Sequence, residues 1–216
     1  MQVIVASDSS QWFPDGFVPE ILELVLATWE KLKLNRDVRL EPRITNLLNL
    51  AIEDEYTREG KEWYVHPEIK GADPVTGKEV SRTDIRIYHR GVPGQKLYFV
   101  FEAKRLHVES NQRIRGGYGE YVGLDGMMCF INGKYSEAAP SGGMLGYVMD
   151  GDLKRAAHGV AQAIDANKNG LKLIAGSDFQ PSKLMPQHPW NGETRHDRNN
   201  GLFIMFHMLL PVKRLA

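Results

Sequence analysis

The hydrophobic period of the sequence changes after Tyr56, and this change constrains the fold more than any other feature. Before it, apolar side chains recur at helical spacing in two segments, 17–34 and about Pro42 to Tyr56. Pro42 suits the first turn of the second helix, where its missing N–H would have no intrahelical partner in any case. We therefore expect the chain to begin with two helices.

Beyond these helices the pattern is typical of strands. The segments 62–69 and 83–90 have strand-like composition, and a turn-rich stretch separates them. The next segment, 96–104, is a nearly continuous apolar run, as expected of a strand at the centre of a sheet. Residues 62–104 are therefore predicted to form a three-stranded antiparallel meander.

The rest of the chain is predicted to add both helices and strands. The expected elements are a glycine-punctuated helix within 116–135, a strand at 143–151, an amphipathic helix at 152–169, a short strand at 171–176 and, after a polar loop at 177–200, a buried strand at 201–212. No repeat or linker divides the chain. This order predicts an α+β or mixed α/β fold in a single domain over residues 1–216.

The composition narrows the class of protein without choosing a function. Hydrophobic residues make up 42% of the 216 residues, enough for a core, and 27 basic residues balance 27 acidic ones. This balance argues against a histone-like nucleic-acid binder but allows a nuclease with one basic face. The single cysteine, Cys129, excludes an intramolecular disulfide and favours a reducing compartment. No apolar run is long enough for a membrane span, and the N-terminus lacks a signal-peptide pattern. We expect a cytoplasmic protein with no membrane partner.

One acidic-x-Lys triplet is distinguished by its position at the end of a buried strand. The chain has four such triplets: Glu59-Gly60-Lys61, Glu68-Ile69-Lys70, Glu102-Ala103-Lys104 and Asp152-Leu153-Lys154. Residues i and i+2 of a strand share a face, so Glu102 and Lys104 point to the same side of this apolar strand. Unpaired charges are costly in such a buried position. Asp84 lies near the start of the preceding strand, and an antiparallel hairpin brings it beside Glu102. The triplet at 68–70 also ends a strand but has no such upstream aspartate.

Two neighbouring carboxylates and a lysine suit the hydrolysis of phosphate esters. The carboxylates repel each other, and a divalent cation that prefers oxygen ligands, Mg²⁺ or Mn²⁺, relieves that repulsion. Such an ion lowers the pKa of a bound water and stabilises charge on a phosphate. Lys104 could orient or deprotonate the attacking water, or neutralise the transition state.

These residues resemble the motif of the PD-(D/E)xK, or restriction-endonuclease-like, nuclease superfamily. The resemblance covers Glu41, Asp84, Glu102, Ala103 and Lys104. It implies an α+β restriction-endonuclease-like fold with a central mixed β-sheet flanked by helices. It also implies that the three acidic side chains surround the metal, that the backbone carbonyl of Ala103 adds a ligand, and that Lys104 is catalytic.

Outside the motif the resemblance is looser. The order of helix, meander, helix and strand over about 36–150 is similar to the core of the superfamily, but Thr83 stands where the motif has proline. The Gln-x-x-x-Tyr pattern of RecB-like members is absent after the triplet. The segments 118–135 and 142–152 are similar to those of little-characterised bacterial members, some associated with antiphage defence. The subfamily stays open.

Basic side chains beyond the triplet are candidates for contact with a phosphate backbone. Arg105, Arg113 and Arg115 follow it closely in the sequence. Arg195 and His196, in the polar loop near the C-terminus, are candidates for reaching the phosphate or the leaving group. A zinc site in that loop would need more ligands at clearer spacing, so we do not expect one.

Structural roles compete with the catalytic ones. Lys104 could simply pair with Glu102 or Asp84 at the end of the sheet. Glu41 could favour the helix N-terminus through the helix dipole. Glu53 and its two acidic neighbours could replace Glu41, although they fall toward the exposed end of that helix.

The function expected from these residues is Mg²⁺-dependent hydrolysis of phosphodiester bonds, with DNA preferred over RNA. The chain could act as a homodimer or with partner subunits of a defence system. One rival is a catalytically inactive nuclease-fold subunit of a multiprotein defence complex. Another is a metal-dependent hydrolase of nucleotides or other phosphoesters, which would need a closed pocket.

Overall fold

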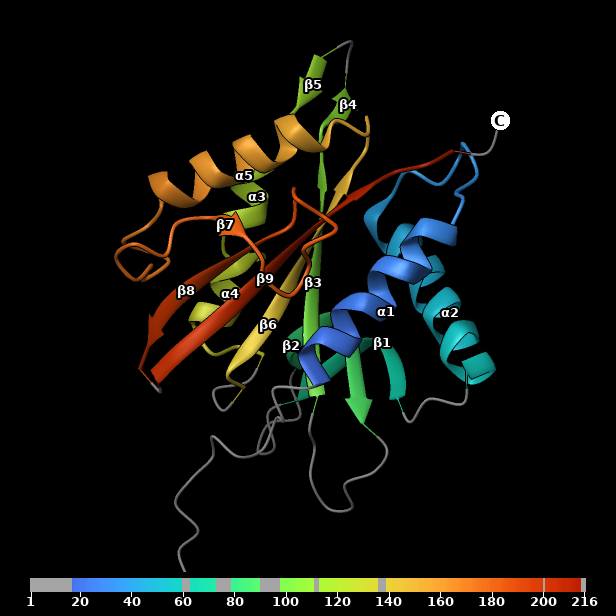
Figure 1. Ribbon diagram of the computed structural model, residues 1–216, viewed down its shortest axis with the longest axis horizontal. Coiled ribbons are helices and arrows are strands. Elements are labelled where there is room, and N and C mark those ends of the chain that lie inside the picture. The colour runs from blue at the N-terminus through green and yellow to red at the C-terminus, as the bar shows by residue number, and fades with distance from the viewer. Residues whose placement is uncertain are drawn as a thin grey trace, which may run out of the picture.

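The chain forms a mixed β-sheet with helices on both faces (Figure 1). The computed structural model describes residues 17–59, 63–72, 79–89, 98–110, 113–135, 139–199 and 201–214. Within them the architecture is α+β with an open mixed sheet flanked by helices, so the coarse fold class predicted from the sequence is confirmed. None of the described helices is both long and apolar enough to cross a bilayer.

Helices and strands alternate irregularly along the chain. In order they are α1 (Phe17–Lys31), α2 (Glu41–Glu59), β1 (Trp63–Ala72), β2 (Glu79–His89), β3 (Tyr98–Leu106), β4 (Val108–Ser110), β5 (Arg113–Arg115), α3 (Tyr118–Val122), α4 (Met127–Ile131), β6 (Ser141–Val148), α5 (Leu153–Ala166), β7 (Gln180–Pro181), β8 (Gly192–Arg198) and β9 (Gly201–Pro211).

The large sheet has the strand order β1-β2-β3-β6-β9-β8-β7. The strands β1, β2 and β3 form the predicted antiparallel meander, and β6 and β9 continue the sheet in parallel. The register of β2 with β3 runs only from Tyr88↔Tyr98 to Ile85↔Phe101. Beyond Phe101 the partner of β3 is β6, as far as Leu106↔Val148. The end of β3 therefore has a free edge on the side of β2.

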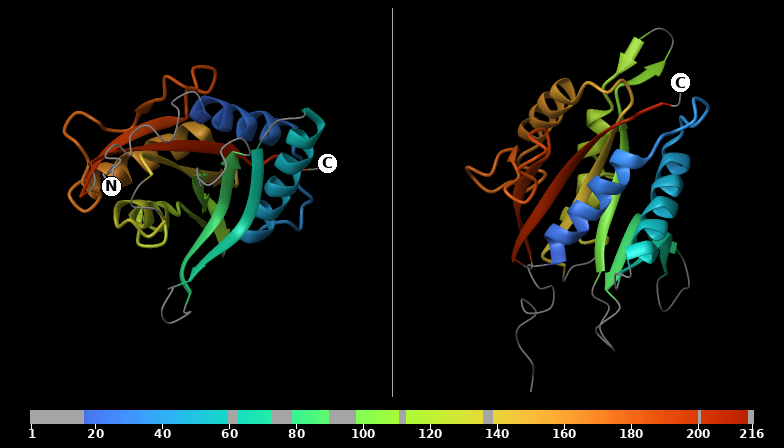
Figure 2. Two further views of the ribbon diagram at one scale, coloured as in Figure 1. Left: turned by 90° about the horizontal axis from the view of Figure 1, so that it is seen from below. Right: turned by 45° about the vertical axis from the view of Figure 1, so that its right-hand side comes forward.

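Two hydrophobic cores lie on opposite faces of this sheet (Figure 2). The first contains the buried faces of α1 and α2 with Phe101 and Ala103. The second contains α3, α4 and α5 with Val100 and Leu106. Because side chains alternate along a strand, Glu102 shares the face of Val100 and Leu106. Lys104, two residues further on, shares this face as well, so two charged side chains lie in a largely apolar layer.

Two predictions near the C-terminus are wrong. Residues 171–176 form turns with one isolated bridge, Leu173↔His196, instead of a short strand. The segment 177–200, expected to be a loop, contains β7 and β8. Alternate residues of β8 are buried, but they are glycine, threonine, histidine and arginine, so hydrophobic alternation could not reveal this strand.

The glycine-punctuated segment forms two short helices, α3 and α4, instead of one. They separate at Gly123–Gly126, and Gly126 is required there because a Cβ atom would lie 2.2 Å from the carbonyl oxygen of Tyr121. Gly117, just before α3, has φ 75° and allows a similarly close approach to β3. These glycines let α3 pack tightly beside the end of β3.

Candidate functional site

The candidate site lies where β2 and β3 separate. Ala103 has no strand partner on the β2 side, and its N–H instead donates to Asp84 Oδ2 at 2.8 Å. The carboxylate of Asp84 therefore replaces the strand partner that β3 loses after Phe101. This arrangement fixes Asp84 against the backbone of the Glu-Ala-Lys triplet.

Glu41 accepts from a second backbone N–H of β3, two residues beyond Ala103. It stands in the first turn of α2, and its Oε2 accepts from the N–H of Arg105 at 3.1 Å. N–H groups two residues apart on a strand point to the same side, so Asp84 and Glu41 lie along the same free edge of β3. Residues from α2, β2 and β3 are thereby brought together.

The ammonium of Lys104 lies among several oxygens of this site. Its Nζ donates to Glu102 Oε1 at 2.5 Å and to the carbonyl oxygen of Ala103 at 2.8 Å, and it lies 3.7 Å from Glu41 Oε1. Glu102 and Lys104 are only 5% and 8% exposed. A buried cation thus occupies the space bounded by the oxygens that the resemblance assigns to a metal.

Tyr135 completes the surroundings of Glu102 and was missed by sequence reasoning. Its hydroxyl donates to Glu102 Oε2, and its side chain is buried. Tyr135 ends the segment that contains α3 and α4 and lies 33 residues beyond Glu102 in the chain. Its sequence gives no signal for this contact, which depends on how that segment folds back over the sheet.

Burial and crowding raise the pKa values of Glu102 and Glu41. Burial, together with the nearby Asp84, raises the pKa of Glu102 to about 8, although Lys104 and Tyr135 oppose the shift. Burial also raises the pKa of Glu41. Burial alone would lower the pKa of Lys104, but Glu102 and Glu41 raise it overall. Lys104 therefore stays charged, and Glu41 and Glu102 resist ionising without more positive charge.

The residues fit a divalent cation in part. Three carboxylates face one ammonium, so a doubly charged ion would neutralise the fully ionised cluster, and carboxylate and carbonyl oxygens are the ligands that Mg²⁺ prefers. However, no three histidine, cysteine, aspartate or glutamate side chains in the described ranges form a group that could hold a metal ion. A metal would therefore rely on two carboxylates with the carbonyl of Ala103.

The site opens into a cavity of about 660 Å³. Glu41, Lys104 and Arg105 line one side of this cavity, which we call the lysine cavity, and residues of α3 and the turn before α4 line the other. Of the triplet, Lys104 is the residue that lines this cavity, so a ligand in the cavity would contact the site at Lys104.

The predicted nucleic-acid contacts are divided between two regions. Arg105 lines the lysine cavity, and Arg113 and Arg115 are exposed on the β4–β5 hairpin that extends beyond the end of β3 (Figure 1). Arg195 is half-exposed on β8, three strands away from β3, and lies 3.7 Å from Glu193.

His196 does not suit its predicted role. It is fully buried, its Nδ1 is 2.8 Å from the carbonyl oxygen of Leu171, and its Nε2 is 2.7 Å from Thr194 Oγ1. Burial lowers its pKa to about 4. His196 is therefore an uncharged core residue that a nucleic acid cannot reach, and the prediction that it contacts nucleic acid is corrected. His207 is buried as well.

The alternative acidic residues lie elsewhere. Glu53 and Asp54 are exposed on α2, and Glu55 pairs with Lys31 at 2.6 Å. Asp152 caps α5 by accepting from the N–H of Arg155. The side chains of the triplet at 68–70 and of Thr83 lie outside the described residues, as does part of the triplet at 59–61.

Comparison with protein-family models, curated proteins and solved structures finds no match to this chain.

Proposed function

We propose that this chain is a metal-dependent nuclease that hydrolyses phosphodiester bonds, with DNA as its substrate. The observation that carries the proposal is the meeting of Asp84 with the Glu102–Lys104 pair where β2 and β3 separate. The parallel pairing of β3 with β6 after an antiparallel meander agrees with a restriction-endonuclease-like core, which we propose as the finer fold class.

In this proposal Asp84, Glu102 and the carbonyl of Ala103 hold Mg²⁺ or Mn²⁺, and Glu41 lies beside Lys104 on the side of the lysine cavity. The bound ion would lower the pKa of a water and offset charge on the phosphate. Lys104 lies in contact with the same oxygens and borders the lysine cavity, so a phosphate entering that cavity meets its ammonium.

The raised pKa of Lys104 argues against one of the three roles considered for it, that of a general base. A general base must lose its proton near neutral pH, which requires a lowered pKa. The carboxylates around Lys104 raise its pKa instead. We therefore assign Lys104 to orienting the water or neutralising charge on the phosphate. Tyr135 is a positioning residue, because its hydroxyl holds the carboxylate of Glu102 and it is not among the residues that line the lysine cavity.

Digestion of plasmid and linear DNA with Mg²⁺, and with the metal chelated, tests the proposal. Wild type should cleave only with the metal. Asp84→Asn and Lys104→Gln should slow cleavage by roughly 100-fold or more, the usual loss for a group that stabilises the transition state. Glu53→Gln, which changes an exposed carboxylate on α2, should cleave like wild type. Equal cleavage by all four proteins would rule out the assigned site.

A non-catalytic nuclease-fold subunit is the second candidate, and one observation favours it. Both carboxylate oxygens of Glu102 already have donors, Lys104 and Tyr135, which is what a purely structural cluster requires. Calorimetric titration with Mn²⁺ separates the two: the nuclease binds the ion at this site, and the inactive subunit does not.

A further inference from the structure

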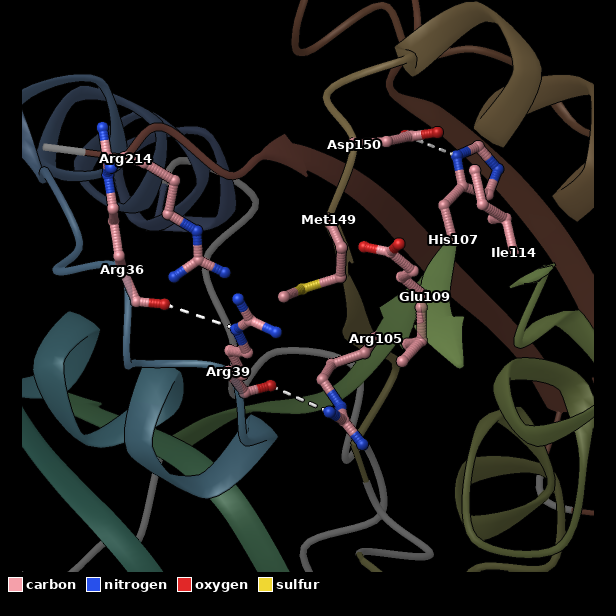
Figure 3. Close-up of a pocket in the computed structure, with 10 residues that line it drawn as sticks. Arg36, Arg39, Arg105, His107, Glu109, Ile114, Met149, Asp150 and Arg214 are labelled. Atoms are coloured by element: carbon pink, nitrogen blue, oxygen red, sulfur yellow. Dashed lines mark hydrogen bonds and ion pairs between the residues drawn. The ribbon is translucent and has the colours of Figure 1, made fainter. Parts of the chain in front are cut away.

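A second cavity, of about 680 Å³, lies beside the lysine cavity (Figure 3). The loop between α1 and α2, the end of β3 and the C-terminal segment line it. Its lining contains four arginines, Arg36, Arg39, Arg105 and Arg214, and we call it the arginine cavity. In Figure 3 the guanidinium groups of Arg214, Arg39 and Arg105 follow one another along one side, facing Met149 and Glu109.

The backbone holds these guanidinium groups in place. Arg105 Nη1 donates to the carbonyl oxygen of Arg39 at 2.8 Å. Arg214 Nη1 donates to the carbonyl oxygens of Asn35 at 3.0 Å and Val38 at 2.5 Å. Each guanidinium has five N–H donors, so these bonds leave several donors available to the cavity. Side chains ordered before binding lose less entropy when a ligand binds.

The positive charge of the arginine cavity is poorly balanced. None of its four arginines forms an ion pair with a carboxylate in the part of the chain that the structure describes. Of the two lining carboxylates, Asp150 is already held by His107 at 2.7 Å and by an arginine of α5, which leaves Glu109 to face four arginines. Burial and the nearby Arg39 lower the pKa of Arg214. Such a cluster suits an anionic ligand.

Arg105 joins the two cavities. It lines both, and it directly follows Lys104 in β3. An extended chain of phosphates that placed one phosphate at Lys104 could therefore place neighbouring ones against Arg105, Arg39 and Arg214. Planar guanidinium groups bind phosphate oxygens in pairs, which suits this ligand better than single positive charges would.

We propose that the arginine cavity binds phosphates of the DNA substrate next to the phosphate that is cleaved. This inference rests on the proposed nuclease function for its substrate, but it concerns binding rather than cleavage. The phosphates are either internal ones of the backbone or a terminal one at a strand end. Either source presents the same oxygens to the same guanidinium groups.

Fluorescence anisotropy of a labelled DNA duplex, with metal chelated so that nothing is cleaved, tests this binding. Arg39→Ala should weaken binding about tenfold and should lower the magnitude of the slope of log affinity against log salt concentration by about one. The double variant Arg39→Ala/Arg105→Ala should lower the magnitude of that slope by about two. The matched controls, Lys183→Ala and Lys168→Ala/Lys183→Ala, remove the same charges from exposed sites and should bind like wild type. Arg39 is exposed, so its loss should not unfold the protein, and Arg39→Glu should weaken binding more than Arg39→Ala.

Several outcomes are distinguishable. Unchanged affinity and salt slope in the arginine variants, or no salt-dependent binding of wild type, would overturn the inference. Arginine-dependent binding without any Mg²⁺-dependent cleavage would support the inference and overturn the proposed nuclease. Repeating the titration with 5′-hydroxyl duplex and with closed circular DNA assigns the source. If Arg39→Ala no longer weakens binding to either of these DNAs, the cavity binds a terminal phosphate. If Arg39→Ala still weakens binding to them, the cavity binds internal phosphates.

Discussion

Proton release on metal binding follows directly from the pKa of Glu102. Burial, with Asp84 nearby, raises that pKa to about 8, so most of the metal-free protein carries a proton on Glu102 at neutral pH. The divalent cation that we propose at this site would bind the ionised carboxylate and would therefore displace this proton. Metal affinity should therefore rise with pH until the metal-free carboxyl is ionised on its own.

The magnitude follows from that pKa. A carboxyl with a pKa of about 8 is roughly nine-tenths protonated at pH 7 and one-tenth protonated at pH 9. Binding of one ion should release about 0.9 proton at pH 7 and about 0.1 at pH 9. The apparent affinity should rise about 50-fold between pH 6 and pH 8, because the ionised fraction rises by that factor.

Isothermal titration calorimetry with Mn²⁺ measures both quantities when it is repeated in two buffers of different ionisation enthalpy. Glu102→Gln should lose most of the release and bind the ion weakly, whereas Glu53→Gln, on the exposed face of α2, should behave like wild type. Heats that do not depend on the buffer at pH 7, together with an affinity that is constant from pH 6 to pH 8, would refute this reasoning.

Three further results are expected. Tyr135→Phe removes the hydroxyl donor of Glu102, so titration with Mn²⁺ should show roughly tenfold weaker binding, as for other residues that orient metal ligands; unchanged affinity would contradict this. Burial lowers the pKa values of His196 and His207 to about 4 and about 3, below the unfolded value, so the stability that these neutral histidines provide is lost as the pH falls below about 6.5. Urea unfolding should show a loss of about 2 kcal/mol for each histidine between pH 7.5 and pH 5, and constant stability would contradict it. Gly117→Ala should destabilise the protein by at least about 1 kcal/mol in the same assay, because φ is 75° and the Cβ would lie 2.4 Å from a carbonyl oxygen of β3; a wild-type midpoint would contradict the strain.

The change of hydrophobic period was enough to predict α1, α2 and the antiparallel meander, because their core-facing residues are apolar. The hairpin also indicated that Asp84 lies near Glu102, but the predicted start of the strand was wrong: β2 begins at Glu79, and Asp84 lies in its middle, where its pairing with β3 ends at Ile85↔Phe101. By contrast, β8 buries polar side chains such as Thr194 and His196 against one another. A polar alternating segment looks exposed from sequence, which is why His196 was wrongly expected to face nucleic acid.

The contacts that could not be predicted join distant parts of the chain. Tyr135 reaches Glu102 only because the segment containing α3 and α4 folds over the sheet. The arginine cavity combines the α1–α2 loop, β3 and the C-terminal segment, and Arg39 lies 66 residues from Arg105 in sequence. The spacing of residues in the sequence cannot predict a contact between such distant segments. It can predict a hairpin or a triplet on one strand, because the residues that form them lie close together in the sequence.

The central claim is that Asp84, Glu102 and the Ala103 carbonyl hold the cation used for phosphodiester hydrolysis. Crystals soaked in Mn²⁺ and measured with X-rays just above the manganese absorption edge test it most directly. We expect an anomalous peak among these three groups, with the ammonium of Lys104 moved away from Glu102 and Ala103. A well-occupied manganese peak only elsewhere, with Lys104 still bound to Glu102, would contradict the claim.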